Sequence, residues 1–141
     1  MNNIKNSFSK QSSPLEVKMM NPLTLAYIGD AVYEIYIRKY LIMNYTSKVN
    51  ELNKKCVKFV RATAQCEAVI SIMDQLDEEE LKVVKRGRNA SPKTVPKNTQ
   101  LIDYKMSSGF EALLGYLYLT GNIERLEYII EKAILKTLDE S

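Results

Sequence analysis

The sequence of 141 residues contains no histidine and no tryptophan, and it has only two cysteines. The absence of histidine excludes Ser-His-Asp and Cys-His catalysis, acid–base catalysis by imidazole, and every metal site with a histidine ligand. Chemistry in this chain therefore has to be done by carboxylates, lysine, tyrosine, serine or a cation held by oxygen.

The two cysteines, Cys56 and Cys66, predict reduced thiols. If both lie on one helix, a rise of 1.5 Å per residue separates them by roughly 15 Å, which is too far for a disulfide. Two thiols without histidine also cannot complete a zinc site. This usage is typical of a cytoplasmic protein.

Long apolar runs are missing too, because no stretch of about 18 uncharged apolar residues occurs and no apolar segment follows a basic start. We therefore expect neither membrane insertion nor secretion. Apolar residues make up 45% of the chain and charged residues 26%, the balance of one folded domain. Twenty basic and 17 acidic side chains leave a net charge of only +3.

No strand-like alternation and no glycine-rich nucleotide loop appears, and the apolar spacing is helical. The pattern predicts an all-α fold of five to seven helices in a single domain over residues 21–141, preceded by a mobile tail over residues 1–20. We expect helices over residues 22 to about 40 or 44, after residues 46–47, through residues 68–73, and over residues 77–87, 107–119 and 123–138. A long connection is expected over residues 88–102.

Asp30 interrupts the most apolar of these helices, which Asn21 and Pro22 start as N-cap and first helical residue. A helix that is apolar on all sides is typical of a domain centre or a subunit interface. Two interpretations of Asp30 stay open. Glu34 pairs with Arg38 while Asp30 finds a nearby donor, or Asp30 is a ligand for a hard cation.

Glu111 raises the same question in a second apolar helix, next to Gly115, whose small size would let another helix approach closely. An exposed glutamate near a helix start needs no function. Two carboxylates on separate core helices without histidine or cysteine nevertheless suit Mg²⁺, with Mn²⁺ as a substitute.

Basic residues gather in two segments that the small net charge conceals. Residues 82–97 carry six basic side chains and no acid, and residues 48–61 carry five against one acid. Such runs are usually solvated faces. Around Gly87, however, two guanidinium groups suit phosphate binding. The candidate phosphate-binding residues are Lys85, Arg86, Arg88, Asn89 and Lys97.

Two motifs resemble those of the ribonuclease III family: residues 25–34, LAYIGDAVYE, and residues 110–115, FEALLG, about eighty residues further on. The segments KRGRNA (85–90) and PKN (96–98) are similar to those of the compact bacterial branch of that family. The resemblance covers about residues 21–138.

The resemblance implies an all-helical endonuclease that cleaves double-stranded RNA with Mg²⁺ and acts as a homodimer. In the compact branch, it implies the precursor of 23S ribosomal RNA as substrate, with ribosomal proteins as further partners. Members of that branch lack the separate double-stranded-RNA-binding domain, so the basic segments would have to hold the RNA. We expect Asp30 and Glu111 to be the catalytic metal ligands, and hydrolysis to leave 5′-phosphate and 3′-hydroxyl ends.

The chain departs from the full-length enzymes at two further acidic positions, where it has Ala26 and Ser108. Asp103 and Glu34 are possible accessory acids. The missing carboxylates leave an alternative open, a catalytically silent domain of this family that binds RNA or ribosomes as a scaffold.

Overall fold

The computed structural model describes residues 3–90 and 94–140, and every regular element among them is helical. The α-helices are α1 (Ile4–Ser9), α2 (Pro14–Lys18), α3 (Pro22–Asn44), α4 (Val49–Val60), α5 (Ala62–Ile72), α6 (Glu78–Ala90), α7 (Leu101–Leu119) and α8 (Ile123–Asp139), and the 3₁₀ turn η1 (Met73–Gln75) follows α5. The all-α class is therefore confirmed. Within the described part of the chain, no helix is long and apolar enough to cross a membrane.

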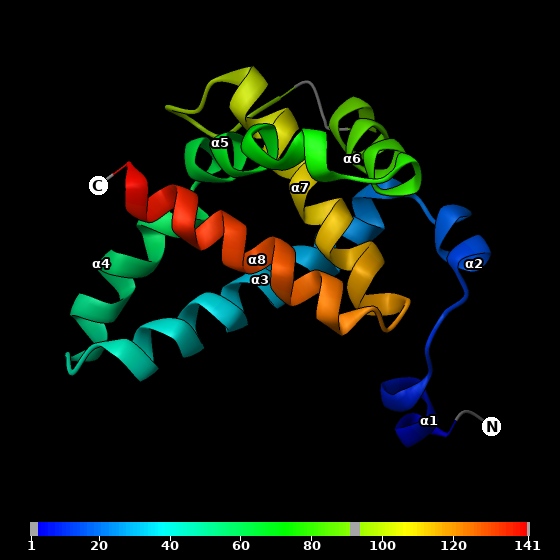
Figure 1. The fold of residues 1–141 in the computed structure, drawn as a ribbon, viewed down its shortest axis with the longest axis horizontal. Helices are drawn as coiled ribbons and strands as arrows, with labels where there is room; N and C mark the ends of the chain where they lie inside the picture. The colour runs from blue at the N-terminus through cyan, green and yellow to red at the C-terminus, as the bar shows by residue number, and fades with distance from the viewer. Residues whose placement is uncertain (1–2, 91–93, 141) are drawn as a thin grey trace.

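Helix α7 is the central element and contacts α2, α3, α5, α6 and α8. It passes through the middle of the molecule, with α5 and α6 on one side and α3 and α8 on the other (Figure 1). Every residue from Met106 to Leu117 is buried except Glu111. A single acid therefore interrupts the most thoroughly buried segment of the chain.

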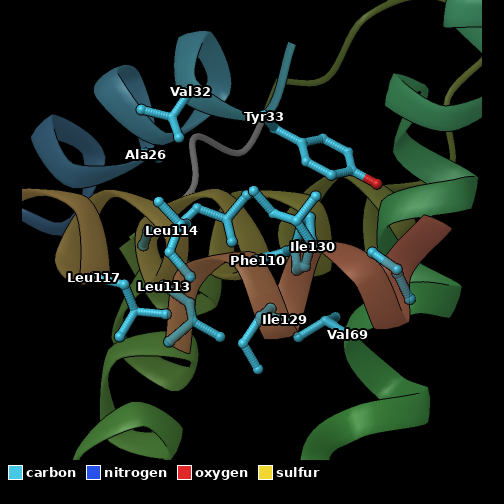
Figure 2. Packing of buried hydrophobic residues seen from close by; sticks show 14 of the residues in the cluster. Ala26, Val32, Tyr33, Val69, Phe110, Leu113, Leu114, Leu117, Ile129 and Ile130 are labelled. Atoms are coloured by element: carbon cyan, nitrogen blue, oxygen red, sulfur yellow. The ribbon is translucent and has the colours of Figure 1, made fainter. Parts of the chain in front are cut away.

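The core is built where α3, α5, α7 and α8 meet. Phe110 of α7 packs edge-on against Tyr33 of α3, with ring centroids 5.1 Å apart. Figure 2 shows Leu113 and Leu117 of α7 beside Ile129 of α8, within the same cluster. Burial of these apolar side chains is the main favourable term that fixes α7 against its neighbours.

Helix α3 begins as predicted, because the side-chain oxygen of Asn21 accepts a hydrogen bond from the Leu23 amide at 2.9 Å. One side of α3 is buried in the core, but the opposite side exposes large apolar residues. Tyr27, Ile35 and Ile42 are 84%, 67% and 62% exposed. Helix α3 is thus apolar on all sides because one face packs in the core and the opposite face is open.

Two predicted boundaries are wrong. The sixth helix does not stop at Gly87 but continues to Ala90, and α7 begins at Leu101 rather than near Ser107. Gly87 is a contact point and not a helix stop, because a Cβ there would lie 2.8 Å from the Cβ of Ala112 and 2.9 Å from the Cα of Gly109. The connection between the two helices is correspondingly shorter than predicted.

The segment before residue 21, predicted as a tail, carries the short helices α1 and α2. A reciprocal capping box between Ser13 and Glu16 starts α2, and Val17 is fully buried in the core. Helix α1 lies apart from the body of the molecule (Figure 1). The predicted mobility of this segment in solution stays a prediction.

Candidate active site

Two glycines bring the backbones of α3 and α7 into direct contact. A Cβ on Gly29 would collide with the carbonyl oxygen of Glu111, and a Cβ on Gly115 would collide with that of Leu25. The close approach inferred from Gly115 in the sequence is therefore present, and Gly29 is its counterpart on α3.

This crossing places Asp30 beside Glu111. Asp30 follows Gly29 directly and is exposed, whereas Glu111 is half-buried. The two carboxyl groups lie close enough together for Asp30 to raise the pKa of Glu111, although 81 positions separate them in the chain. The structure thus brings together the two acids that the sequence selected.

Glu111 has a strongly perturbed acidity. Burial is the largest cause, and the negative charge of Asp30 and a hydrogen bond to Asp30 add to it, so that the pKa of Glu111 rises to about 8. A hydrogen bond from Gln65 acts in the opposite direction. Two like charges held together in a partly desolvated place raise a carboxyl pKa in this way. Strongly shifted pKa values of this kind occur preferentially at functional sites.

Gln65, on α5, is the third member of the site, and the sequence analysis missed it. Its Nε2 donates to Glu111 Oε2 at 3.3 Å and to the backbone oxygen of Val60 at 2.7 Å. The side chain is 2% exposed. A signal was present in the sequence, because Gln65 interrupts the apolar stripe of its helix as Asp30 does in α3.

At positions 26 and 108, where the sequence analysis noted missing acids, the side chains bring no carboxylate to the site. Ala26 is buried, and the Ser108 hydroxyl donates to the Tyr104 carbonyl of its own helix at 3.1 Å. Of the accessory candidates, Glu34 forms an ion pair with Arg38 at 3.3 Å. Asp103 faces Cys66, where burial first, and then Asp103, raise the pKa of the thiol to about 11.

The candidate RNA-binding residues differ in their surroundings. Lys85, Asn89 and Lys97 are exposed, and Arg88 Nε donates to Asn89 Oδ1 at 3.2 Å. Arg86 Nη1 and Nη2 donate to the carbonyl oxygens of Lys18 and Met20 at 2.8 and 3.2 Å. Arg86 therefore already holds the C-terminal end of α2, and Lys93 of the same basic segment lies outside the described residues.

The donors at the acid pair fit a hard divalent cation. The two carboxylates offer only oxygen as a ligand atom, and Mg²⁺ commonly uses one or two carboxylates while it keeps several waters. Among the residues that the structure describes, no three Asp, Glu, Cys or His side chains cluster as a metal cage. A cation would also offset the repulsion between Asp30 and Glu111 that raises the pKa of Glu111.

Comparison with known proteins defines the class of this helical fold and acid pair. The family profile described as "Ribonuclease III domain" matches residues 23–122, which include both acids. The fold also resembles a crystal structure of a protein from Fusobacterium nucleatum, with a TM-score of 0.78, 32% identity, and coverage of 87% of this chain and 97% of that one. The chain belongs to the ribonuclease III family.

Within the family, the chain belongs to the compact branch that its motifs predicted. It is 50% identical over 135 residues to "Mini-ribonuclease 3" of Clostridium tetani, covering 95% of this chain and 86% of the relative. It is 42% identical to "Mini-ribonuclease 3" of Brevibacillus brevis, covering 94% and 98% of the two chains. The protein is therefore an endoribonuclease, and the predicted enzyme class is confirmed.

Proposed function

We propose that this endoribonuclease cleaves double-stranded RNA with Mg²⁺, and that Asp30 and Glu111 hold the metal. The observation that carries the proposal is the proximity of two interacting carboxyl groups, one from α3 and one from α7, at the point where both backbones touch. Mn²⁺ is the expected substitute, because it accepts the same oxygen ligands.

Each acid has a distinct part in this proposal. Glu111 is anchored by Gln65 on its inner side, so its carboxylate is held in place. Asp30 is exposed and lies on the side from which a phosphodiester can approach. A bound divalent cation supplies charge neutralisation at the phosphate and a more acidic water, which gives 5′-phosphate and 3′-hydroxyl products.

RNA binding is assigned to the basic residues at the end of α6 and in the segment before α7. Lys85 and Lys97 are exposed cations, and Arg88 and Asn89, which lie between them in the sequence, form a polar pair. Phosphate contacts of this kind track the shape of an A-form duplex rather than its sequence. Arg86 is proposed to support RNA binding in two ways. It holds α6 against the end of α2, and it contacts a phosphate.

The open face of α3 supports a homodimer. Tyr27, Ile35 and Ile42 recur every seven or eight residues, which places them on one side of the helix. Large apolar residues that are exposed together mark an interaction surface more often than a solvated one. Because Tyr27 is three residues from Asp30, a dimer through this face would bring two acid pairs near one another.

For the substrate, we propose the precursor of 23S ribosomal RNA, in the cytoplasm and with ribosomal proteins as partners. Support comes from the branch to which the chain belongs. The acid pair would account for duplex cleavage, but among the described residues of the site we identify no group that selects this RNA.

The test is a cleavage assay on a duplex RNA, on a 23S precursor stem and on a matched single strand, with Mg²⁺, Mn²⁺ or chelator. We expect cleavage of both duplexes with either metal, no cleavage in chelator, and preference for the precursor stem. Products should be degraded by a 5′-phosphate-dependent exonuclease and extended by a polymerase that needs a 3′-hydroxyl. Full activity in chelator, or 3′-phosphate products, would contradict the metal-dependent mechanism.

A further inference from the structure

Gln65 connects three separate parts of the fold through one amide group. The side chain projects from α5, and its two N–H groups reach the last residue of α4 and the acid of α7. The contact to the Val60 carbonyl at 2.7 Å also fixes the orientation of the amide, because the opposite orientation would place two oxygens against each other.

The glutamine side chain carries a free-energy cost at this position. Its Oε1 is buried and has no hydrogen-bond partner in the described structure. A buried acceptor without a partner costs about 1–3 kcal/mol. An apolar side chain of the same size would fill the space without that cost, so packing does not account for a glutamine here.

A neutral donor is well suited to hold a carboxylate that must also bind a cation. A lysine or arginine at this position would neutralise Glu111 and repel the metal, whereas an amide holds one carboxylate oxygen and adds no charge. Groups that orient metal ligands in this way commonly lie just outside the ligands themselves.

We propose that Gln65 is a positioning residue that fixes the Glu111 carboxylate beside Asp30 in the orientation that binds the divalent cation. This inference rests on the proposed function. Gln65 does not contact the RNA or the reacting atoms in this account. It acts through Glu111, and the anchor at Val60 makes the arrangement rigid.

The experiment measures Mn²⁺ binding to the protein without RNA, by the loss of the free-ion signal in electron paramagnetic resonance. Gln65→Met keeps a long unbranched side chain and removes both donors. We expect Mn²⁺ affinity to fall about tenfold, as for other groups that orient metal ligands. In the cleavage assay, the Mg²⁺ concentration for half-maximal rate should rise by a similar factor, with the rate at saturating Mg²⁺ close to that of the wild type.

Two variants serve as references. Ser71→Ala alters another α5 side chain, whose hydroxyl donates to the Ala68 carbonyl of its own helix, and should leave Mn²⁺ affinity unchanged. Glu111→Gln removes the ligand itself and defines the signal without a site. Thermal unfolding of each variant, followed by circular dichroism, identifies those that are folded.

The outcomes separate this inference from the proposed function. If the wild type binds Mn²⁺ no better than Glu111→Gln, the metal site fails and the proposed function with it. If the wild type binds and a folded Gln65→Met binds equally well, only the role of Gln65 is overturned. Gln65→Leu is the second variant, and if neither folds, Gln65 is a structural residue and the inference is wrong.

Discussion

At the scale of single residues, the site depends on one acid that lies where acids are costly. Glu111 is the one residue between Met106 and Leu117 that is half-buried rather than buried, and partial burial together with the charge of Asp30 raises its pKa to about 8. A carboxyl group of this kind is largely neutral near pH 7 when no cation is bound. The repulsion between the Asp30 and Glu111 carboxyl groups would therefore be relieved by the cation that we propose they bind.

The raised pKa makes stability depend on pH in a defined direction. The ordinary pKa of a glutamate is 4.5, and in the fold it is about 8, so the folded protein favours the neutral form. The stability due to Glu111 is therefore complete below about pH 4.5 and is lost as the pH rises towards 8. In chelator, we expect the melting temperature of the wild type to fall relative to that of Glu111→Gln between pH 5 and pH 8.

Glu111→Gln is the matched reference for this measurement, because glutamine has the shape of the neutral acid and does not titrate. Addition of Mg²⁺ should reduce the relative loss at pH 8, since a bound cation stabilises the ionised form. Melting curves of the two proteins that stay parallel over this range would show that Glu111 ionises normally.

At the scale of helices, the site depends on contact between α3 and α7 without intervening side chains. Gly29 and Gly115 permit this contact, and Gly87 and Gly109 permit a second one between α6 and α7. Helix α7 takes part in both contacts. Its contact with α3 determines where Asp30 lies relative to Glu111.

Gly29→Ala should destabilise the protein, contrary to the usual effect of alanine. Within a free helix, Gly to Ala stabilises by about 1 kcal/mol. Here the new Cβ would collide with the Glu111 carbonyl, and such overpacking costs about 1–3 kcal/mol or more. We expect a lower free energy of unfolding in urea and a large loss of cleavage.

Lys39→Gly, at an exposed position further along α3 and off the Tyr27 face, is the control for helix propensity. It should cost about 1 kcal/mol and leave cleavage by the folded protein intact. A Gly29→Ala protein as stable and active as the wild type would refute the close crossing.

The basic residues at the end of α6 should separate into two kinds. Lys85→Ala removes an exposed cation and should weaken RNA binding while it reduces the salt dependence by about one phosphate contact. Arg86→Ala removes donors to the Lys18 and Met20 carbonyls and should lower the melting temperature. Fluorescence anisotropy at several salt concentrations, together with thermal unfolding, measures both effects. The assignment fails if Arg86→Ala leaves the melting temperature unchanged and Lys85→Ala leaves the salt dependence unchanged.

The sequence predicted the helical class, the start of α3 and both acids, because these depend on local signals or on a charge within an apolar pattern. It misplaced the end of α6, because Gly87 resembles a helix stop unless its contact with Gly109 on another helix is known. Gln65 stands out in the apolar pattern of its helix, but that pattern does not identify its partner Glu111, 46 positions away, just as no local pattern links Arg86 to Lys18, 68 positions away.

At the scale of the whole molecule, the described surface has an open apolar face beside the acid pair. A dimer through the Tyr27 face of α3 would bury this surface and align two sites for the two strands of one duplex. In such a dimer both sites would act on the same RNA, so the dimer geometry would be part of substrate binding.

Tyr27→Asp should convert the dimer to a monomer, because a charge replaces an aromatic side chain that is 84% exposed in the single chain. Light scattering coupled to size exclusion measures the mass, and a value of about 32 kDa is expected for the wild type, twice the 16.2 kDa of the chain. Tyr118→Asp, at an exposed tyrosine of α7, is the control and should stay dimeric. A wild-type mass equal to that of one chain would exclude the dimer.

The central claim is that Asp30 and Glu111 together hold the cation that cleaves RNA, and single-turnover cleavage of one duplex RNA in saturating Mg²⁺ tests it most directly. We compare the wild type with Asp30→Asn, Glu111→Gln and Glu124→Gln, an exposed acid on α8. Loss of metal assistance costs several kcal/mol, so the first two rates should fall by roughly 10³-fold or more with folding and RNA binding retained, and the third should not change. Wild-type rates in folded Asp30→Asn or Glu111→Gln would contradict the account.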